Sequence, residues 1–505
     1  MITLIFSLGI IILLTLVVSI FFWSKIQFDW LSKLCSGLIL SLPFEYFPRV
    51  EIGGASWRIS QVLVIVGFWI LAVLVVKKDQ QLLSHKIHFA SWYLFVFFVL
   101  SSPSWFFIKD FQRFIIHSVG TIFVFGAMVL LANFATNVWK SLQRLALVLF
   151  GCSIFGLFQF FGDLISIPTT FTLLREQYTK IVFGVPRIQG TAVEPLYFAG
   201  MLMIAIFTLI FWICERFEQR TQLEITTYCH LERSERSCAI VEKTLTIITA
   251  DTVLDSDLIN YNFARNVSNQ FKNHTIKYLC IILTTILIVF VLTISKGTFG
   301  VLAILALPLL IVIFFTFDFF KQYIYNHLFQ GILAILLFGI AFFTFVNPIA
   351  LLGEIGTNFI ETLSGTSASA VERSMFVSQA NNAIYDNPIF GIGMGQYGDY
   401  VGNNLGLLNE DGKAIVNNVY LEIWLEEGIT ALFFFIFMLF QPIAILLRLL
   451  ATRWSPLRAE NLAALSIIFI LVGYYIQWTL FSPIFIMPIF IILGLAYNLI
   501  SNYDS

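Results

Sequence analysis

Long apolar runs recur from one end of this sequence to the other, and two clear examples are residues 192–212 and 299–317. A helix of about 20 apolar residues spans the roughly 30 Å of hydrocarbon in a bilayer and satisfies its own backbone hydrogen bonds there. Of the 505 residues, 59% are hydrophobic and 12% are charged, whereas soluble domains carry about 25% charged residues. The runs and the composition therefore predict a multi-spanning integral membrane protein and exclude a water-soluble fold.

Charge and cysteine usage exclude several classes of partner and site. The formal net charge is −1, and the arginines and lysines are scattered rather than gathered on one stripe, so no nucleic-acid partner is expected. The six cysteines lack the paired spacing of a zinc or redox site, and we expect no disulfide among them.

The hydropathy pattern predicts an all-α protein with about 12–13 transmembrane helices. Residues 1–23 lack the basic region and the cleavage site of a secretory signal, so we expect a retained helix there. The second candidate span, residues 34–47, is short and contains Pro43 and Glu45, and it is either a crossing or a re-entrant segment. The candidate spans are residues 1–23, 34–47, 61–76, 89–108, 114–134, 145–162, 191–213, 277–294, 298–317, 328–346, 418–447, 462–481 and 483–500.

The distribution of positive charge between alternate loops predicts the orientation. Nineteen of the 29 Lys and Arg residues fall in one set of loops, and eight of them lie in residues 215–277. Cytoplasmic loops are enriched in Lys and Arg, but the rule is weaker for long loops. The short loops 77–88 and 448–460, with three positive charges each, therefore decide the assignment of this set to the cytoplasm. Loops 163–190 and 347–417 then lie on the outer face.

The spans divide the chain into five segments. One polar segment contains YCHLERSERSC, a near-repetitive run without a core-forming pattern, and we assign it no chemistry. The two long outer loops hold most of the informative residues, as is common for loops of this length. The segments are 1–214 with the N-terminal helices, 215–276 as a cytoplasmic polar insertion, 277–346 with the central helices, 347–417 as a large, partly helical extracytoplasmic loop, and 418–505 with the C-terminal helices.

The first candidate site is GVPRIQGTAVEPLYFAG, where an outer loop ends and a helix begins. Pro195 fits the first turn of a helix because it needs no hydrogen-bond donor there. Arg187 and Glu194 are therefore expected near the membrane surface, as a phosphate-binding cation and a base. The alternative is an interfacial ion pair, or an arginine that extends toward the lipid headgroups.

The second candidate site is a helix predicted within the large outer loop. Ser369 and Glu372 have the spacing of a capping box, and Asp386 begins the D-N-P sequence that ends the helical pattern. Arg373 lies in the first turns and suits bidentate contact with a lipid-borne diphosphate, although a solvated arginine is the alternative. The apolar positions at helical intervals are Val371, Met375, Phe376, Ala380, Ala383 and Ile384.

The glycine-rich sequence GIGMGQYG follows this helix. No strand precedes it and no βαβ unit can surround it, so we do not expect it to bind a dinucleotide. We predict a flexible turn over a cavity, in which Tyr397 and Tyr400 stack on sugar faces or, alternatively, anchor the loop at the membrane interface.

The third candidate site is VNNVYLEIWLEEGI, at the start of a long helix. Acidic residues suit the N-terminus of a helix. Glu426 and Glu427 are less usual because they precede a mostly apolar run, and a cavity or an arginine partner would explain them. The residues expected at the outer entrance, where they would bind substrate, are Asn417, Asn418, Tyr420 and Glu422.

Together these stretches resemble the O-antigen ligase and O-antigen polymerase superfamily of membrane glycan-joining enzymes. The resemblance extends over most of residues 90–500 and rests on the order and spacing of three features. They are an arginine before a Glu-Pro helix start (Arg187, Glu194, Pro195), an arginine ahead of D-N-P-x-x-G-x-G (Arg373, then Asp386 to Gly393), and N-x-Y-L-E-x-x-x-E-x-G at the start of a later helix (Asn418 to Gly428).

The resemblance implies a glycosyltransferase of the bacterial inner (cytoplasmic) membrane that uses no metal, cofactor or nucleotide sugar. The donor would be a glycan on undecaprenyl diphosphate, and the acceptor would be a glycan or a lipid-linked acceptor such as the lipid A-core. Arg187 and Arg373 would stabilise the departing diphosphate. Glu194, or a neutral acceptor nearby, would take the proton of the attacking hydroxyl. Membrane lipids are expected partners, and a chain-length regulator protein is a candidate partner.

One position departs from the family pattern. Ligases of the superfamily usually have a histidine before the asparagine of the third motif, and this chain has Asn417 there. Because an asparagine cannot serve as a general base, the sequence favours a polymerase of repeat units, or a related exopolysaccharide enzyme, over a ligase.

A secondary transporter, a flippase or a non-catalytic sensor would explain the hydrophobicity equally well. Transporters usually carry ionisable groups at mid-membrane and often contain inverted repeats. His117 and Lys296 come closest to such positions. We expect the first to be a packed or interfacial residue and the second to face the headgroups, and no repeat is evident. A transporter therefore remains the alternative hypothesis, and the glycan-joining enzyme is favoured over it.

Overall fold

The computed structural model describes residues 27–44, 49–52, 55–84, 88–174, 187–192, 194–244, 275–293, 295–317, 368–405, 416–453, 455, 458–479 and 487–504. Within these residues, nine helices are long and apolar enough to cross a membrane, and α19 (Met487–Asp504) is a shorter apolar helix. The prediction of an all-α integral membrane protein is confirmed. The predicted spans 1–23 and 328–346 lie outside the described residues.

The spanning segments agree with the hydropathy pattern to within a few residues at most ends. The second of them, Phe89–Phe107, is built from three short helices, η2 (Phe89–Trp92), α5 (Tyr93–Ser101) and η3 (Ser102–Phe107). The others are α3 (Ile59–Val76), α6 (Phe111–Phe134), α7 (Val138–Leu164), the first part of α9 (Pro195–Thr244), the helix Thr275–Leu292, α11 (Lys296–Thr316), α17 (Ile429–Arg453) and α18 (Ala459–Gln477).

α18 is the central helix of the bundle. Of its apolar stretch 78% is buried inside the protein, against 28% for α11, and it packs against α7, α9, α11, α17 and α19.

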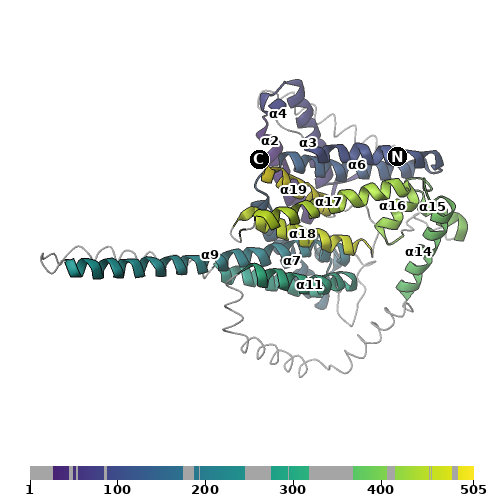
Figure 1. The fold of residues 1–505 in the computed structure, drawn as a ribbon. Helices are drawn as coiled ribbons and strands as arrows, with labels where there is room; N and C mark the ends of the chain where they lie inside the picture. The colour runs from purple at the N-terminus through teal and green to yellow at the C-terminus, as the bar shows by residue number, and fades with distance from the viewer. Residues whose placement is uncertain are drawn as a thin grey trace.

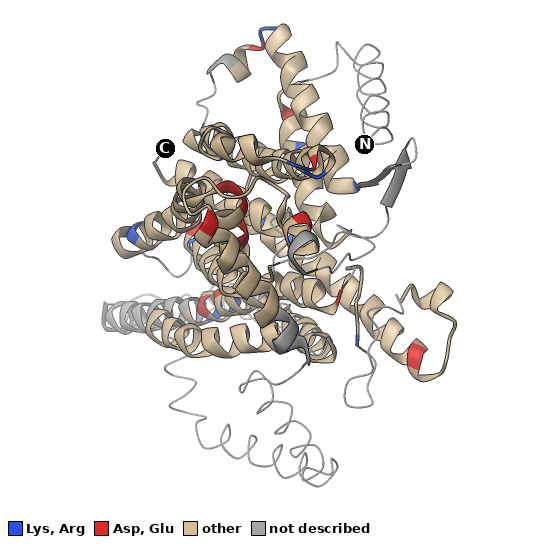
Figure 2. Ribbon diagram, turned by 90° about the vertical axis from the view of Figure 1, so that its right-hand side faces the viewer, with Lys and Arg blue, Asp and Glu red and all other residues tan. Residues whose placement is uncertain are grey.

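A glycine allows the close approach of two other helices, α19 and α6. At Gly494 of α19 a Cβ would lie 2.8 Å from the carbonyl oxygen of Met128 in α6, so a larger residue would separate these two helices. Charged residues are sparse along the described helices of the bundle (Figure 2), as a membrane-spanning bundle requires.

The segment between residues 29 and 44 crosses the bundle and does not turn back. It consists of α2 (Asp29–Ser41) and η1 (Leu42–Phe44), which together are about 26 Å long at the usual rise per residue. Ser32 Oγ lies 3.2 Å from Thr136 Oγ1 in the turn between α6 and α7. At the opposite end Thr191, just before α9, donates to the carbonyl of Pro43. These contacts favour a crossing over a re-entrant segment.

A short antiparallel hairpin connects this segment to α3. It is formed by β1 (Arg49–Ile52) and β2 (Ala55–Arg58), with Arg49 opposite Arg58. Trp57 is buried and meets the ring of Phe123 edge-on at 5.9 Å. The hairpin is therefore packed through Trp57 against the middle of α6.

α9 is longer than its apolar run. It continues without a break to Thr244, so the polar run 228–238 has a helical backbone. Figure 1 shows this second half of α9 extending well beyond the other helices, on the side away from α14 (Ala368–Asp386), α15 (Tyr397–Leu405) and α16 (Val419–Glu427). No break in the helix marks the predicted start of the polar insertion at residue 215.

The predicted span 418–447 is wrong as a single helix, because α16 and α17 are separate. Gly428 divides them with a φ of +90°, a conformation that L side chains rarely adopt. The break keeps Glu426 and Glu427 at the end of α16 and lets α17 begin with apolar residues.

Candidate functional site

The end of α18 joins the starts of three other helices. Gln477 Nε2 donates to Thr298 Oγ1 in the first turn of α11 at 3.1 Å and lies 3.5 Å from the carbonyl oxygen of Leu196 in the first turn of α9. The next residue, Trp478, accepts at its carbonyl from the backbone N–H of Val419, the first residue of α16, at 3.1 Å. The segments before α9, α11 and α16 therefore meet at one end of the bundle, which we call the motif end.

Arg187 has a fixed position at the motif end. Its side chain is half-buried, and Nε donates to the carbonyl of Thr293 at 3.2 Å. The backbone N–H of Ile188 donates to the carbonyl of Leu292 at 3.2 Å, so the loop is bound to the end of the helix Thr275–Leu292. Burial lowers the pKa of Arg187, and the negative charge of Glu194 opposes that shift. An arginine held here retains its charge in a partly dry setting.

The predicted helix that carries Arg373 is confirmed as α14. Its apolar face packs inside the protein, in a cluster with residues of α15 and α16. The backbone of Arg373 lies in α14, and its side chain is not among those the structure describes. The approach of Arg373 to Arg187 therefore stays a prediction. The buried residues on the apolar face are Phe376, Ala380, Ala383 and Ile384.

The glycine-rich sequence after α14 is hydrogen-bonded to the end of α16, unlike the flexible turn that the sequence predicts. We call residues 391–397 the glycine strap. The N–H groups of Ile392 and Gly393 donate to the carbonyls of Leu425 and Glu426 at 2.7 and 3.0 Å. At Gly391, which has a φ of +75°, a Cβ would lie 2.7 Å from the carbonyl oxygen of Leu425. Only glycine permits this approach of the two backbones.

Glu426 binds the other half of the strap through its side chain. Its carboxylate accepts from the N–H of Gly395 at 2.8 Å and from the N–H of Tyr397 at 3.0 Å. His117 Nε2 lies 3.8 Å away. Burial raises the pKa of Glu426 to about 7, and the two backbone hydrogen bonds and the charge of Arg113 oppose this shift. The charge of Arg113 thus corresponds to the arginine partner that the sequence suggests for Glu426, and the N–H groups of Gly395 and Tyr397 bind the same carboxylate.

Glu427 points to the transmembrane segment before α6. Ser101 Oγ in α5 donates to its Oε2 at 3.3 Å, and the side chain is buried. Burial and the neighbouring charge of Glu426 raise the pKa of Glu427 well above its ordinary value. A neutral carboxyl is the form that such an environment favours.

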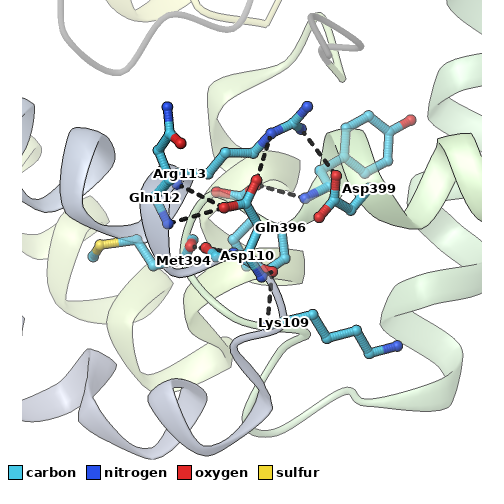
Figure 3. A network of polar contacts seen from close by, with 9 residues as sticks. Lys109, Asp110, Gln112, Arg113, Met394, Gln396 and Asp399 are labelled. Carbon is cyan, nitrogen blue, oxygen red and sulfur yellow. Dashed lines mark hydrogen bonds and ion pairs between the residues drawn. The ribbon is translucent and has the colours of Figure 1, made fainter. Parts of the chain in front are cut away.

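Gln396 connects the strap to the turn between η3 and α6 (Figure 3). Its Oε1 accepts from the N–H groups of Lys109 and Asp110 at 2.9 and 2.8 Å. Its Nε2 donates to the carbonyls of Asp110 and Met394 at 3.0 and 3.3 Å. Because the side chain is only 3% exposed, each of these backbone groups would lose a partner in a dry setting if Gln396 were truncated.

Arg113 forms a second link around Gln396. Its side chain lies 3.3 Å from the carboxylate of Asp110 and 3.7 Å from that of Asp399 in α15 (Figure 3). Sequence analysis did not select Arg113 or Gln396. Two features of the sequence mark these residues weakly: Asp110 precedes α6 and caps it by accepting from the N–H groups of Gln112 and Arg113, and Gln396 is the one amide side chain within the glycine strap.

The residues predicted to bind substrate at the start of α16 make contacts within the protein. Asn418 caps α16, because its Oδ1 accepts from the N–H of Leu421 at 3.1 Å. The Tyr420 hydroxyl donates to the carbonyl of Tyr475 at 3.1 Å. Asn417, with a φ of +59°, and Glu422 are partly exposed. Their substrate contacts stay predictions.

Tyr397 lies inside the protein. Its side chain is 2% exposed, and its hydroxyl donates to the carbonyl of Phe376 in α14 at 2.6 Å. The ring therefore packs between α14 and α16 in this structure, and its predicted stacking on a sugar would require it to leave this position. Tyr400 is more exposed, with its hydroxyl 3.5 Å from Asp386 Oδ2.

The Glu426→Gln variant is expected to remove one pH dependence of stability. The pKa of Glu426 is about 7 in the folded protein and 4.5 in its ordinary state, so between these values the folded protein holds a proton that the unfolded chain has released. The proton on Glu426 therefore stabilises the folded protein at low pH, and this stabilisation is lost as the pH rises through about 7. Thermal unfolding in detergent should show wild type losing stability relative to the variant from acid to neutral pH. A difference that is constant with pH would contradict the assignment.

Residues 281–436 match the family model described as O-antigen ligase. This match supports an O-antigen ligase-like membrane enzyme. The resemblance to the O-antigen ligase and polymerase superfamily is confirmed. No curated protein matches the chain. The O-antigen ligase match contains α11, α14, the glycine strap and α16, and it ends within α17. Arg187 and Glu194 lie before it in sequence, yet Arg187 is hydrogen-bonded to Thr293 inside it.

Proposed function

We propose that this O-antigen ligase-like protein transfers a glycan from undecaprenyl diphosphate to an acceptor at the outer face of the bacterial inner membrane. The acceptor is a growing glycan if the enzyme is a polymerase and the lipid A-core if it is a ligase. The observation that carries the proposal is the motif end, where the half-buried Arg187 lies beside the first turns of α9 and α11 and α16 begins. α14, which bears Arg373, packs against α16.

The proposed chemistry needs positive charge where the leaving group departs. A hydroxyl oxygen of the acceptor attacks the anomeric carbon of the donor sugar, the bond from that carbon to the diphosphate oxygen breaks, and undecaprenyl diphosphate leaves as an anion. Arg187 and Arg373 would stabilise this anion, since preorganised cations in a partly dry site are more effective than solvated ones. Glu194 would accept the proton of the attacking hydroxyl. The electrostatic interaction between Glu194 and Arg187 supports this pairing of roles.

Polymerisation is the favoured form of the reaction. The position before Asn418 is Asn417, which has no side chain able to take up a proton at neutral pH. A mechanism that requires a histidine there is therefore unsupported, and the carboxylate of Glu194 is the better base. The direct product would be a longer glycan that remains on undecaprenyl diphosphate.

The Arg373 variants test the function in cells. A strain that lacks this protein would be complemented with wild type, Arg373→Ala or Arg373→Lys, with equal amounts in the membrane, and the length of the surface polysaccharide would be measured. Wild type is expected to restore long chains, Arg373→Ala to give single repeats, and Arg373→Lys to give partial extension, because a lysine keeps the charge without the bidentate geometry. Complete loss of glycan from its final acceptor would indicate a ligase. A surface that does not change in any of the strains would reject both.

A further inference from the structure

Two segments at the motif end carry large apolar side chains that are 38–90% exposed. One is η3 with the start of α6, and the other is the last turn of α14 with the residues that follow it. Phe106 is 90% exposed, Ile389 is 55% exposed and Phe390 is 49% exposed. We call the whole set the aromatic rim. Its members are Trp105, Phe106, Phe107, Phe111, Tyr385, Ile389 and Phe390.

The two halves of the aromatic rim are parts of one rigid surface. The glycine strap begins directly after Phe390, and its Gln396 side chain is bound to the backbone of Lys109 and Asp110, between Phe107 and Phe111. A Cβ at Gly393 would lie 3.4 Å from the backbone of Phe107. The turn after α14 therefore cannot move away from η3 unless these contacts break.

The backbone contacts fix the depth of the rim in the bundle. The N–H of Ile429, the first residue of the spanning helix α17, donates to the carbonyl of Ile389 at 3.2 Å. Thr430 Oγ1 lies 3.4 Å from the carbonyl oxygen of Leu100 in α5, and η3 is itself the end of the span Phe89–Phe107. The rim therefore lies level with the ends of two transmembrane segments, although half of it belongs to a loop.

The rim also continues the lipid-facing surface of those segments. Phe433, Phe437 and Phe440 are 49–67% exposed and lie on one face of α17, at intervals of four and three residues. Phe95 and Val99 are 62% and 50% exposed on α5. Lys109 is exposed just beyond Phe107. Apolar faces followed by aromatic rings and then a lysine are the usual order from hydrocarbon to headgroup.

We propose that the aromatic rim is inserted in the membrane leaflet at the motif end, so that the turn after α14 is a membrane anchor. The occupant of the exposed surface is lipid, with acyl chains against Ile389 and Phe390 and a headgroup phosphate near Lys109. The anchor holds the end of α14 at the headgroup level. This proposal rests on the membrane fold and does not depend on the proposed glycan transfer.

The test places a photo-reactive side chain in the rim of the full chain. p-Benzoylphenylalanine replaces Phe390, and the purified protein is irradiated in vesicles of phosphatidylethanolamine and phosphatidylglycerol. Adducts are identified by mass spectrometry. The same residue in place of Phe437, on the lipid-facing side of α17, is the positive control. In place of Ser378, which is an exposed polar residue of α14 outside the aromatic rim, it is the control for a position that we expect to face water.

A lipid adduct at position 390 as abundant as that at 437, and several times more abundant than that at 378, is the expected result. A yield at 390 as low as that at 378 would overturn the proposal, because the rim would then face water. An adduct between two protein chains, in place of lipid, would also overturn it by identifying a second copy as the occupant. An equal elution volume of the three proteins in detergent checks that each is folded.

Discussion

Replacement of Arg187 by alanine is expected to lower the rate of glycan transfer in vesicles by about 10²–10³-fold, the usual effect of removing one preorganised group that stabilises developing charge. The guanidinium is held by the carbonyl of Thr293 and is half-buried, so solvent cannot replace it in the partly dry site. The measurement is the rate of release of undecaprenyl diphosphate from a lipid-linked glycan donor by the purified protein. Arg187→Lys is expected to retain part of the rate, since it keeps the charge and loses the fork geometry.

Arg458 offers a matched control for this experiment. It is an exposed arginine at the opposite end of the bundle, where it lies 3.3 Å from Glu460. Arg458→Ala removes the same charge from the protein and should leave the transfer rate unchanged. Equal rates for Arg187→Ala and Arg458→Ala would contradict the role of Arg187 in the reaction.

Gly428→Ala is expected to cause the largest loss of stability among single-methyl additions at the site, about 3 kcal/mol in the free energy of unfolding. A Cβ at this position would lie 2.3 Å from the carbonyl oxygen of Ile389, and the φ of +90° is itself strained for alanine. The clash is with backbone, which cannot rotate away as a side chain can. The backbone at Ile389 and Phe390 would have to move away from Gly428, so the midpoint of thermal unfolding in detergent should fall by several degrees.

Gly300→Ala is the matched control for this substitution. Gly300 lies in α11, and a Cβ there meets no atom within 4 Å. Alanine favours a helix over glycine by about 0.5–1 kcal/mol, so this variant should unfold at the same temperature as wild type or slightly above it. If Gly428→Ala unfolded at the same temperature as Gly300→Ala, the close approach of Gly428 to the backbone of Ile389 would be contradicted.

Hydropathy was sufficient to predict the spanning helices, because each apolar run must be long enough to cross the bilayer. It was not sufficient for residues 34–47. That segment is too short to classify by its own sequence, and it is the contacts of Ser32 with Thr136 and of Pro43 with Thr191 that favour a crossing for its described part. Hydropathy also predicted α16 and α17 as one helix, because the mean hydropathy of a stretch of about 20 residues does not depend on the positive φ of a single glycine such as Gly428.

The motifs predicted which segments meet but not how they are held. The D-N-P sequence correctly predicted the end of α14 at Asp386, and the arginine suggested as a partner of Glu426 corresponds to the charge of Arg113. The partners themselves could not be predicted, since the amides of Gly395 and Tyr397 carry no side-chain signal. Gln396 was missed for a related reason, because its partners are backbone groups some 286 residues earlier in the chain.

We expect Arg187 and Arg373 to hold one diphosphate together at the motif end. A cryo-electron microscopy structure of the full chain with its undecaprenyl-diphosphate-linked donor tests it most directly. We expect density for the diphosphate within hydrogen-bond distance of both guanidinium groups, beside the first turns of α9 and α11. A diphosphate bound at the other end of the bundle, or guanidinium groups too far apart to contact it together, would contradict the proposed role of the two arginines.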